Sequence, residues 1–218
     1  MYCYAQPANL RTSTVFVLIN YNRELKINGD LLFMNIYGKN VVLRAMELED
    51  CELIKDMFND PEIEHLVGGW AFPLSLFAQE RWLASHYDDK SGLRFVIDTK
   101  EDGVVGVYTL TDIDWKNRRA EIGAKIASNE NRFKGYGTDA TMAVMRYVFD
   151  ELGFHRLDVS WLAENTVSES TFTKCGFVKE GIKREYIYKG GNYRDLVEAS
   201  ILVDEYYEII NSNHYWEQ

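Results

Sequence analysis

Two glycines, Gly135 and Gly137, stand between a strand-like segment and a long helix-like segment, and this arrangement constrains the fold most. Residues 120–127 read as a strand, and apolar residues recur at helical spacing from Thr138 to about Leu152. Glycines let backbone N–H groups converge on a ligand, and the N-terminus of the following helix adds partial positive charge. The turn therefore predicts a binding site for a phosphate or pyrophosphate group.

Other interpretations of this turn have to be weighed. A P-loop requires Gly-Lys-Ser/Thr at its second glycine, whereas Gly137 is followed by Thr138. Gly135-x-Gly137-x-x-Ala140 fits the dinucleotide-binding fingerprint, and Asp158 lies at a plausible distance, but that fold places its glycines directly after the first strand. Here the turn lies in mid-chain behind a polar stretch. A glycine-rich loop without a ligand is the third alternative.

The charge balance limits the classes of partner. The chain carries 24 Lys and Arg against 34 Asp and Glu, which gives a formal net charge of −10. Nucleic acids and anionic membranes bind basic surfaces, so we expect neither as a partner. An acidic protein is compatible with a cationic amine substrate. The four histidines are too far apart in the sequence for metal-ligand spacing, so no metal is expected.

The sequence also predicts a cytoplasmic protein. Its longest apolar run, residues 14–19, is far shorter than the ~20 residues that a membrane-spanning helix needs. The N-terminus lacks the basic start and the small-residue cleavage pattern of a signal peptide. Three scattered cysteines imply no disulfide framework.

Strand-like and helix-like segments alternate along the chain, which is typical of an α/β or α+β sheet protein. We expect an N-terminal extension at residues 1–38, one domain at 39–210 and a C-terminal tail at 211–218. Asn28-Gly29 predicts a tight hairpin in the extension. Three interpretations of the extension stay open: an added hairpin, a dimer arm, or an upstream reading of a start that belongs at Met34. The expected strands are 41–44, 93–98, 104–111, 120–127, 156–161, 177–188 and 195–203, and the expected helices are 48–58, 74–86, 138–152 and 168–174.

Three motifs resemble a known family. Arg132-x-x-Gly135-x-Gly137 resembles the Arg/Gln-x-x-Gly-x-Gly/Ala signature of the GNAT superfamily of N-acetyltransferases. Downstream, the Asn165-x-x-Ser168 motif and the following Lys-x-Gly-Phe stretch are similar to the RimJ/RimL-like branch of that superfamily. The resemblance covers roughly residues 39–204. It implies the GNAT fold, a central mixed, mostly antiparallel twisted sheet of six to seven strands flanked by helices, with acetyl-CoA as co-substrate.

The resemblance also implies which residues bind the co-substrate. The backbone amides of residues 133–138 are expected to hold the pyrophosphate of CoA, and the pantetheine arm is expected to run along a strand where its neighbour splays away. Asn165 is expected to hydrogen-bond that arm, and Phe172 to lie near the thiol. The expected cofactor-binding residues are Ile126, Ala127, Arg132, Phe133, Lys134, Gly135, Tyr136, Gly137, Thr138, Asn165 and Phe172.

Glu121 is the candidate catalytic base. Only a neutral amine attacks a thioester carbonyl, so a base has to remove a proton from the ammonium. Glu121 matches in spacing the glutamate that histone-acetylating members of the superfamily use. The alternative is that Glu121 merely pairs with Arg118 or Arg119.

The proton donor is harder to identify. Many relatives in the superfamily have a tyrosine seven residues after the asparagine, and this chain has Phe172 there. A phenyl ring cannot donate a proton, so the role is empty or is taken by another group. Tyr136, Ser168 and Ser170 are candidates that the sequence does not distinguish.

The implied function is transfer of an acetyl group from acetyl-CoA to a primary amine by direct attack. A protein N-terminus, a polyamine and an amino sugar all remain open as acceptors, and a homodimer is an open alternative to a monomer. Gly68–Phe72, Trp82, Tyr108 and Trp115 are expected to form the acceptor wall. The competing hypothesis is a non-catalytic acyl-CoA-binding module of the same fold, which the missing tyrosine suggests.

Overall fold

The computed structural model describes residues 26–27, 30–31, 35–69, 72–86, 91–127 and 131–217. The chain divides into two units, Met1–Phe33 and Met34–Gln218. In the first unit, β1 (Lys26–Ile27) and β2 (Asp30–Leu31) pair antiparallel. The apolar run at 14–19 and the Asn-Gly turn at 28–29 lie outside the described residues.

The second unit is built on one sheet of eight described strands in the order β3-β4-β5-β6-β7-β8-β10-β9. All neighbours pair antiparallel except β7 and β8, which are parallel. The sheet exceeds the expected six to seven strands because the short β3, which lies within the range assigned to the extension, pairs with β4. The strands are β3 (Ile36–Tyr37), β4 (Val41–Ala45), β5 (Leu93–Thr99), β6 (Gly103–Asp114), β7 (Arg119–Ile126), β8 (Arg156–Leu162), β9 (Val178–Lys189) and β10 (Asn192–Leu202).

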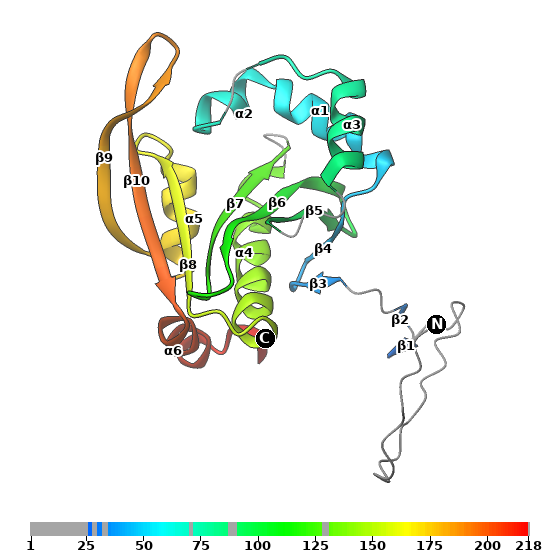
Figure 1. Cartoon of the computed structure of the whole chain (residues 1–218). Helices are drawn as coiled ribbons and strands as arrows, with labels where there is room; N and C mark the ends of the chain where they lie inside the picture. The colour runs from blue at the N-terminus through cyan, green and yellow to red at the C-terminus, as the bar shows by residue number, and fades with distance from the viewer. Residues whose placement is uncertain are drawn as a thin grey trace, which may run out of the picture. The chain divides into compact units, whose positions relative to one another are not determined.

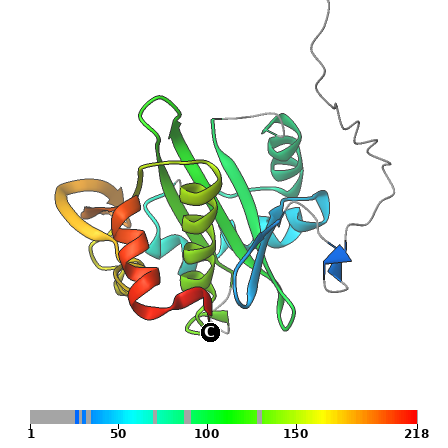
Figure 2. The same cartoon turned by 90° about the horizontal axis from the view of Figure 1, so that it is seen from below.

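Helices cover both faces of this sheet. The larger core lies between the sheet and the helices α4 to α6, and a smaller core lies under α1 and α2. Figure 1 shows α4 alongside the central strands and α1 to α3 grouped at one end of the sheet, and Figure 2 shows α6 beside α4. The helices are α1 (Cys51–Asn59), α2 (Pro61–Leu66), α3 (Leu76–His86), α4 (Tyr136–Arg146), α5 (Thr166–Lys174) and α6 (Val203–Asn213), with short turns η1 (Leu48–Asp50), η3 (Tyr147–Glu151) and η4 (Tyr215–Glu217). Among the described residues, no helix is long and apolar enough to cross a membrane.

The two halves of the sheet separate between β7 and β8. The parallel pairing runs only from Arg119 opposite Arg156 to Ile122 opposite Val159. Beyond that point β7 stays with β6 as far as Ile126, while β8 stays with β10. The strands therefore diverge beside the later residues of β7, as Figure 1 shows.

Close packing fixes the last residues of β7 against β6. A Cβ added at Gly106 of β6 would lie 2.1 Å from the Lys125 carbonyl oxygen, so only glycine fits there. The N–H of Ala127 donates to Val105 O at 2.6 Å and extends the contact beyond the strand. The end of β7 that has separated from β8 is thus held in place by β6.

Helix α4 is anchored at its first turns by Asp139, which is 4% exposed. Its carboxylate accepts hydrogen bonds from the N–H groups of Lys39, Asn40 and Val41 at 2.6–3.1 Å and from the Tyr215 hydroxyl at 3.0 Å. Residues 211–217, expected as a tail, therefore include a turn that packs on the domain. The same carboxylate ties this turn and the β3–β4 hairpin to the start of α4.

Candidate active site

The glycine turn, residues 132–138, has left-handed backbone at two positions directly before a helix. Phe133 (φ +66°) and Gly135 (φ +87°) both adopt left-handed backbone, and α4 begins at Tyr136. A Cβ added at Gly135 would meet no protein atom within 4 Å, so the main chain faces open space there. Seven of the expected residues line one cavity at this turn, namely Ile126, Arg132, Phe133, Gly135, Tyr136, Gly137 and Thr138.

Lys134 is not among the residues that line this cavity, and its ammonium forms an ion pair with Asp102. Lys134 Nζ and the Tyr136 hydroxyl both donate to Asp102 Oδ2, each at 2.7 Å. The hydrogen bond from Lys134 lowers the pKa of Asp102, and the same bond raises the pKa of Lys134. The hydrogen bond to Asp102 likewise raises the pKa of Tyr136. The hydroxyl of this candidate proton donor is therefore engaged in holding the turn.

A second cavity continues from the turn into the splay between β7 and β8. It shares Ile126, Arg132 and Gly137 with the first cavity and adds Asn165 and Phe172. The structure thus brings these expected co-substrate residues together. Ala127 instead packs against the smaller core.

Asn165 has a structural task in addition to its place in the cavity. Its Oδ1 accepts from Ser168 N at 3.0 Å and caps α5, while its Nδ2 donates to Leu66 O at 2.8 Å. The buried amide therefore joins the end of α2 to the start of α5. The expected hydrogen bond to a pantetheine arm would have to share these groups.

A third cavity, of about 470 Å³, links the splay to Glu121. Lys125, Asn165 and Phe172 line both the second and the third cavity. The Phe172 ring lies against Trp161, with the ring centroids 5.8 Å apart and 19° between their planes. One continuous set of cavities therefore leads from the glycine turn, past Phe172, to the candidate base.

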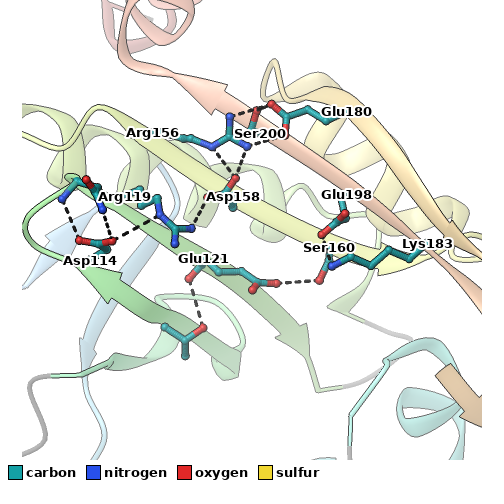
Figure 3. A network of polar contacts seen from close by, with 12 residues as sticks. Asp114, Arg119, Glu121, Arg156, Asp158, Ser160, Glu180, Lys183, Glu198 and Ser200 are labelled. Carbon is teal, nitrogen blue, oxygen red and sulfur yellow. Dashed lines mark hydrogen bonds and ion pairs between the residues drawn. The ribbon is translucent and has the colours of Figure 1, made fainter. Parts of the chain in front are cut away.

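Glu121 lies where β7 and β8 are still paired, and its carboxylate accepts a hydrogen bond from Ser160 Oγ at 2.8 Å (Figure 3). The two arginines weighed as its partners interact elsewhere. Arg118 Nη1 donates to Gly153 O, and Arg119 lies 3.7–3.8 Å from Asp114 and Asp158. The carboxylate is therefore oriented by a neutral hydroxyl, which suits a group that has to accept a proton.

Charged side chains from β6 to β10 surround Glu121 on the same side of the sheet. This polar face comprises Asp114, Arg119, Glu121, Arg156, Asp158, Ser160, Glu180, Lys183, Glu198 and Ser200 (Figure 3). Arg156 donates hydrogen bonds to Asp158 and Glu180, and the hydrogen bonds that Glu180 accepts from Arg156 and Ser200 lower its pKa to about 2. A fourth cavity at this face adds Asp112 and Tyr186 and shares Glu121 and Ser160 with the third.

The expected aromatic acceptor wall is only partly present. Tyr108 is wrong for this role because it is fully buried and its hydroxyl donates to Thr141 Oγ1. Trp82 stacks on His86, and Trp115 packs edge-on against Phe154. Gly68 and Gly69 do line the third cavity, whereas residues 70–71 lie outside the described residues.

Phe58, Lys125 and Ser160 are among the residues lining the third cavity that the sequence did not predict. Lys125 could have been found from the strand period, because it lies on the same face of β7 as Glu121. Ser160 required knowledge that β8 pairs with β7, and Phe58 required the packing of α1. Among the described residues, no group of His, Cys, Asp or Glu is placed to hold a metal ion.

Comparison with known proteins agrees with this geometry. The family model of the acetyltransferase (GNAT) domain matches residues 40–178. The uncharacterized N-acetyltransferase p20 of Bacillus licheniformis is 32% identical over 176 residues, which cover 78% of this chain and 97% of that protein. The spermidine N(1)-acetyltransferase of Vibrio cholerae is 27% identical over 171 residues, which cover 78% and 96%.

A solved structure shares the fold. The crystal structure of spermidine N-acetyltransferase from Vibrio cholerae in complex with CoA and spermine superposes with a TM-score of 0.72 at 26% identity. The match covers 77% of this chain and 98% of the other. The eight-stranded mixed sheet and its helices thus have the architecture of a CoA-binding acetyltransferase.

Proposed function

Because this chain belongs to the GNAT acetyltransferase family and is an acetyl-CoA-dependent N-acetyltransferase, we propose that its acceptor is a small cationic amine of the polyamine class. The observation that carries the proposal is the position of Glu121. It lies where the cavities from the glycine turn open onto the polar face, so one carboxylate adjoins both the donor channel and a surface rich in carboxylates.

The proposed reaction assigns one task to each end of the cavities. Backbone amides of the glycine turn and Arg132 bind the pyrophosphate, and the pantetheine arm enters the splay beside Ile126. Glu121 accepts a proton from the acceptor ammonium, directly or through water, and the neutral amine attacks the thioester carbonyl. Ser160 orients the carboxylate for that step.

Charge and relatives together favour a polyamine. Five carboxylates and three basic groups line the cavity at the polar face, and most of these groups pair with one another. Among the described residues, the side chains of Asp112 and Glu121 in this cavity have no ion-pair partner, so they are available to ammonium groups. The related Vibrio cholerae enzyme is a spermidine acetyltransferase.

The test is a comparison of acceptors with the full chain. Release of free CoA thiol from acetyl-CoA is followed with spermidine, with glucosamine and with a peptide that has a free N-terminus. We expect the largest kcat/KM for spermidine, and a loss of that preference as rising salt screens the polar face. Faster turnover of the amino sugar or the peptide would reject the polyamine.

A protein N-terminus is the second candidate acceptor. It is favoured by the similarity of the Asn165-x-x-Ser168 motif and the residues after it to the RimJ/RimL-like branch. We assign the chain to that branch as a hypothesis, and the peptide in the same assay tests it. Turnover of the peptide alone would replace the polyamine proposal.

Self-association through residues 1–38 is a separate proposal, motivated by the strand-like character of this segment. Size-exclusion chromatography of the full chain and of a version that starts at Met34 tests it. A dimer for the full chain and a monomer for the shorter version would support the proposal. The same assembly state for both versions would reject it.

A further inference from the structure

Lys125 shares one face of β7 with Glu121. Side chains alternate along a strand, so Glu121, Gly123 and Lys125 point to one side of the sheet, while Ile122 and Ile126 pack toward the larger core. Gly123 between them has no side chain to divide the cavity. Lys125 accordingly lines both the cavity in the splay and the cavity that contains Glu121.

The Lys125 ammonium lacks the partner that a partly buried lysine normally has. Among the described residues, its Nζ makes no hydrogen bond or ion pair and lies 3.9 Å from the centre of the Phe58 ring. The nearby Glu64 carboxylate is paired with Lys189 at 2.8 Å. Lysines are rarely buried without an anion, so an unpaired one in a cavity is a candidate for a functional role.

Burial makes this ammonium easier to deprotonate. Desolvation lowers the pKa of Lys125, and the charge of Lys189 on β9 lowers it further, while Glu64 on α2 opposes the change. Phe58 of α1 offers only the face of a ring, and Arg119 and Glu121 are the other titratable groups on this face of β7. A lowered pKa brings the ammonium closer to the pKa of a thiol, about 8.5, which favours proton transfer to a thiolate.

Lys125 lies in the part of the channel where the sequence lacks the usual proton donor. Phe172 lines the same two cavities as Lys125, and its phenyl ring has no proton to give. Tyr136 is bonded to Asp102 at the far side of the glycine turn. Ser168, another candidate donor, lines both cavities, but an alcohol is a much weaker acid than an ammonium. Of these four side chains, Lys125 therefore carries the group best suited to donate a proton within the channel.

We propose that the Lys125 ammonium donates a proton to the CoA sulfur as the thioester breaks, which rests on the proposed function. The acceptor nitrogen forms a bond with the carbonyl carbon, and the electron pair of the carbon–sulfur bond leaves on sulfur. A proton moves from Lys125 Nζ to that sulfur, and the neutral lysine then regains a proton from solvent. The acceptor ammonium loses one proton to Glu121 before the attack, and its nitrogen loses a second proton to solvent as the amide forms. Glu121 then returns its proton to solvent, so the products are an acetamide and free CoA thiol, with one proton released in total.

The test uses Lys125→Met and Lys125→Arg in the full chain. For Lys125→Met we expect kcat about 100-fold lower, with unchanged CoA affinity by calorimetry, because general acids contribute about 10²–10⁴-fold. Lys125→Arg keeps the charge and holds its proton at all working pH values, so we expect an intermediate kcat. Lys179→Met, which removes an exposed lysine paired with Glu169, is the matched control and should match the parent.

The pH profile separates a proton donor from a structural lysine. The donor works only while protonated, so kcat of the parent should fall as pH rises through the lowered pKa of Lys125, and Lys125→Arg should lack that fall. A parent profile without a basic limb overturns the proposal whether or not the variants fold. So does a parent-like kcat in Lys125→Met, or a loss of CoA affinity that accounts for its whole defect. Absence of turnover by the parent with every acceptor would instead reject the proposed function.

Discussion

The glycine turn and the polar face belong to the same sheet, yet they are built in different ways. The turn is one continuous segment of seven residues whose left-handed backbone at Phe133 and Gly135 exposes main-chain groups ahead of α4. The polar face collects its side chains from β6, β7, β8, β9 and β10 (Figure 3). The first is a main-chain site and the second is a side-chain site.

This difference indicates which binding site the members of the family share and which site varies from one member to the next. A main-chain site depends on glycine positions and a helix start, so it is recognisable in sequence and serves one ligand class. A side-chain site changes with each substitution on any of several strands. Membership of the family therefore identifies acetyl-CoA as the co-substrate, while the acceptor has to be determined from the polar face.

The sharpest test of this division is Glu121→Gln. We expect kcat to fall about 100- to 1,000-fold because a general base is lost, while CoA affinity stays unchanged. Steady-state kinetics and calorimetry on the same preparation measure both quantities. A parent-like kcat would show that Glu121 is not the base, and a parent without any turnover would favour the acyl-CoA-binding module instead.

The opposite pattern is expected for Gly135→Ala, with Gly190→Ala as its matched control. Both glycines have positive φ (+87° and +57°), and an added Cβ meets no protein atom within 4 Å at either position. Each substitution should therefore lower the free energy of unfolding by about 1 kcal/mol through backbone strain.

Only Gly135→Ala places a methyl group where the phosphates are proposed to bind, so we expect its CoA affinity to fall at least about tenfold, or 1.4 kcal/mol. Calorimetric titration with CoA and thermal unfolding of the two variants make the comparison. Equal CoA affinity in both variants would contradict the assignment of the turn.

The sequence predicted the turn better than its surroundings for a physical reason. The glycine pattern and the following helix are local, so spacing alone was enough to find them. The hydrogen bond between Ser160 and Glu121 depends on strand pairing across the domain, and helix α2 (Pro61–Leu66) is too short to show helical periodicity. The resemblance assigned Lys134 to the phosphate site, and only the fold brings Asp102 close enough to bind its ammonium.

Substitution of Asp139 tests whether the hydrogen bonds that anchor the start of α4 contribute to stability. Asp139→Asn keeps the side-chain shape but replaces one acceptor oxygen with an N–H₂ group that faces backbone donors. We expect the free energy of unfolding to fall by about 1.5–3 kcal/mol, the range for hydrogen bonds to charged groups. Denaturant unfolding measures this loss.

Tyr215→Phe is the graded control for Asp139→Asn, because it removes only the hydroxyl that donates to Asp139. We expect a loss of about 1 kcal/mol from this single bond. If Asp139→Asn is no less stable than Tyr215→Phe, the backbone bonds of Asp139 do not anchor α4.

The smallest effect is expected at the rim of the polar face, for Glu180→Gln. Arg156 and Ser200 lower the pKa of Glu180 to about 2, so its ionised form stabilises the fold. That stabilisation is fully present above the unfolded-state pKa of about 4.3 and is lost as pH falls toward 2. The side chain is 46% exposed, so solvent screening should limit its contribution to at most about 1 kcal/mol at pH 7. Unfolding of the parent and the variant at pH 7, 4 and 2.5 should show a gap in stability that narrows with acid. If the difference in free energy of unfolding is constant across this range, Glu180 stabilises the fold through packing. Ion pairing would then contribute little to the stability of the polar face.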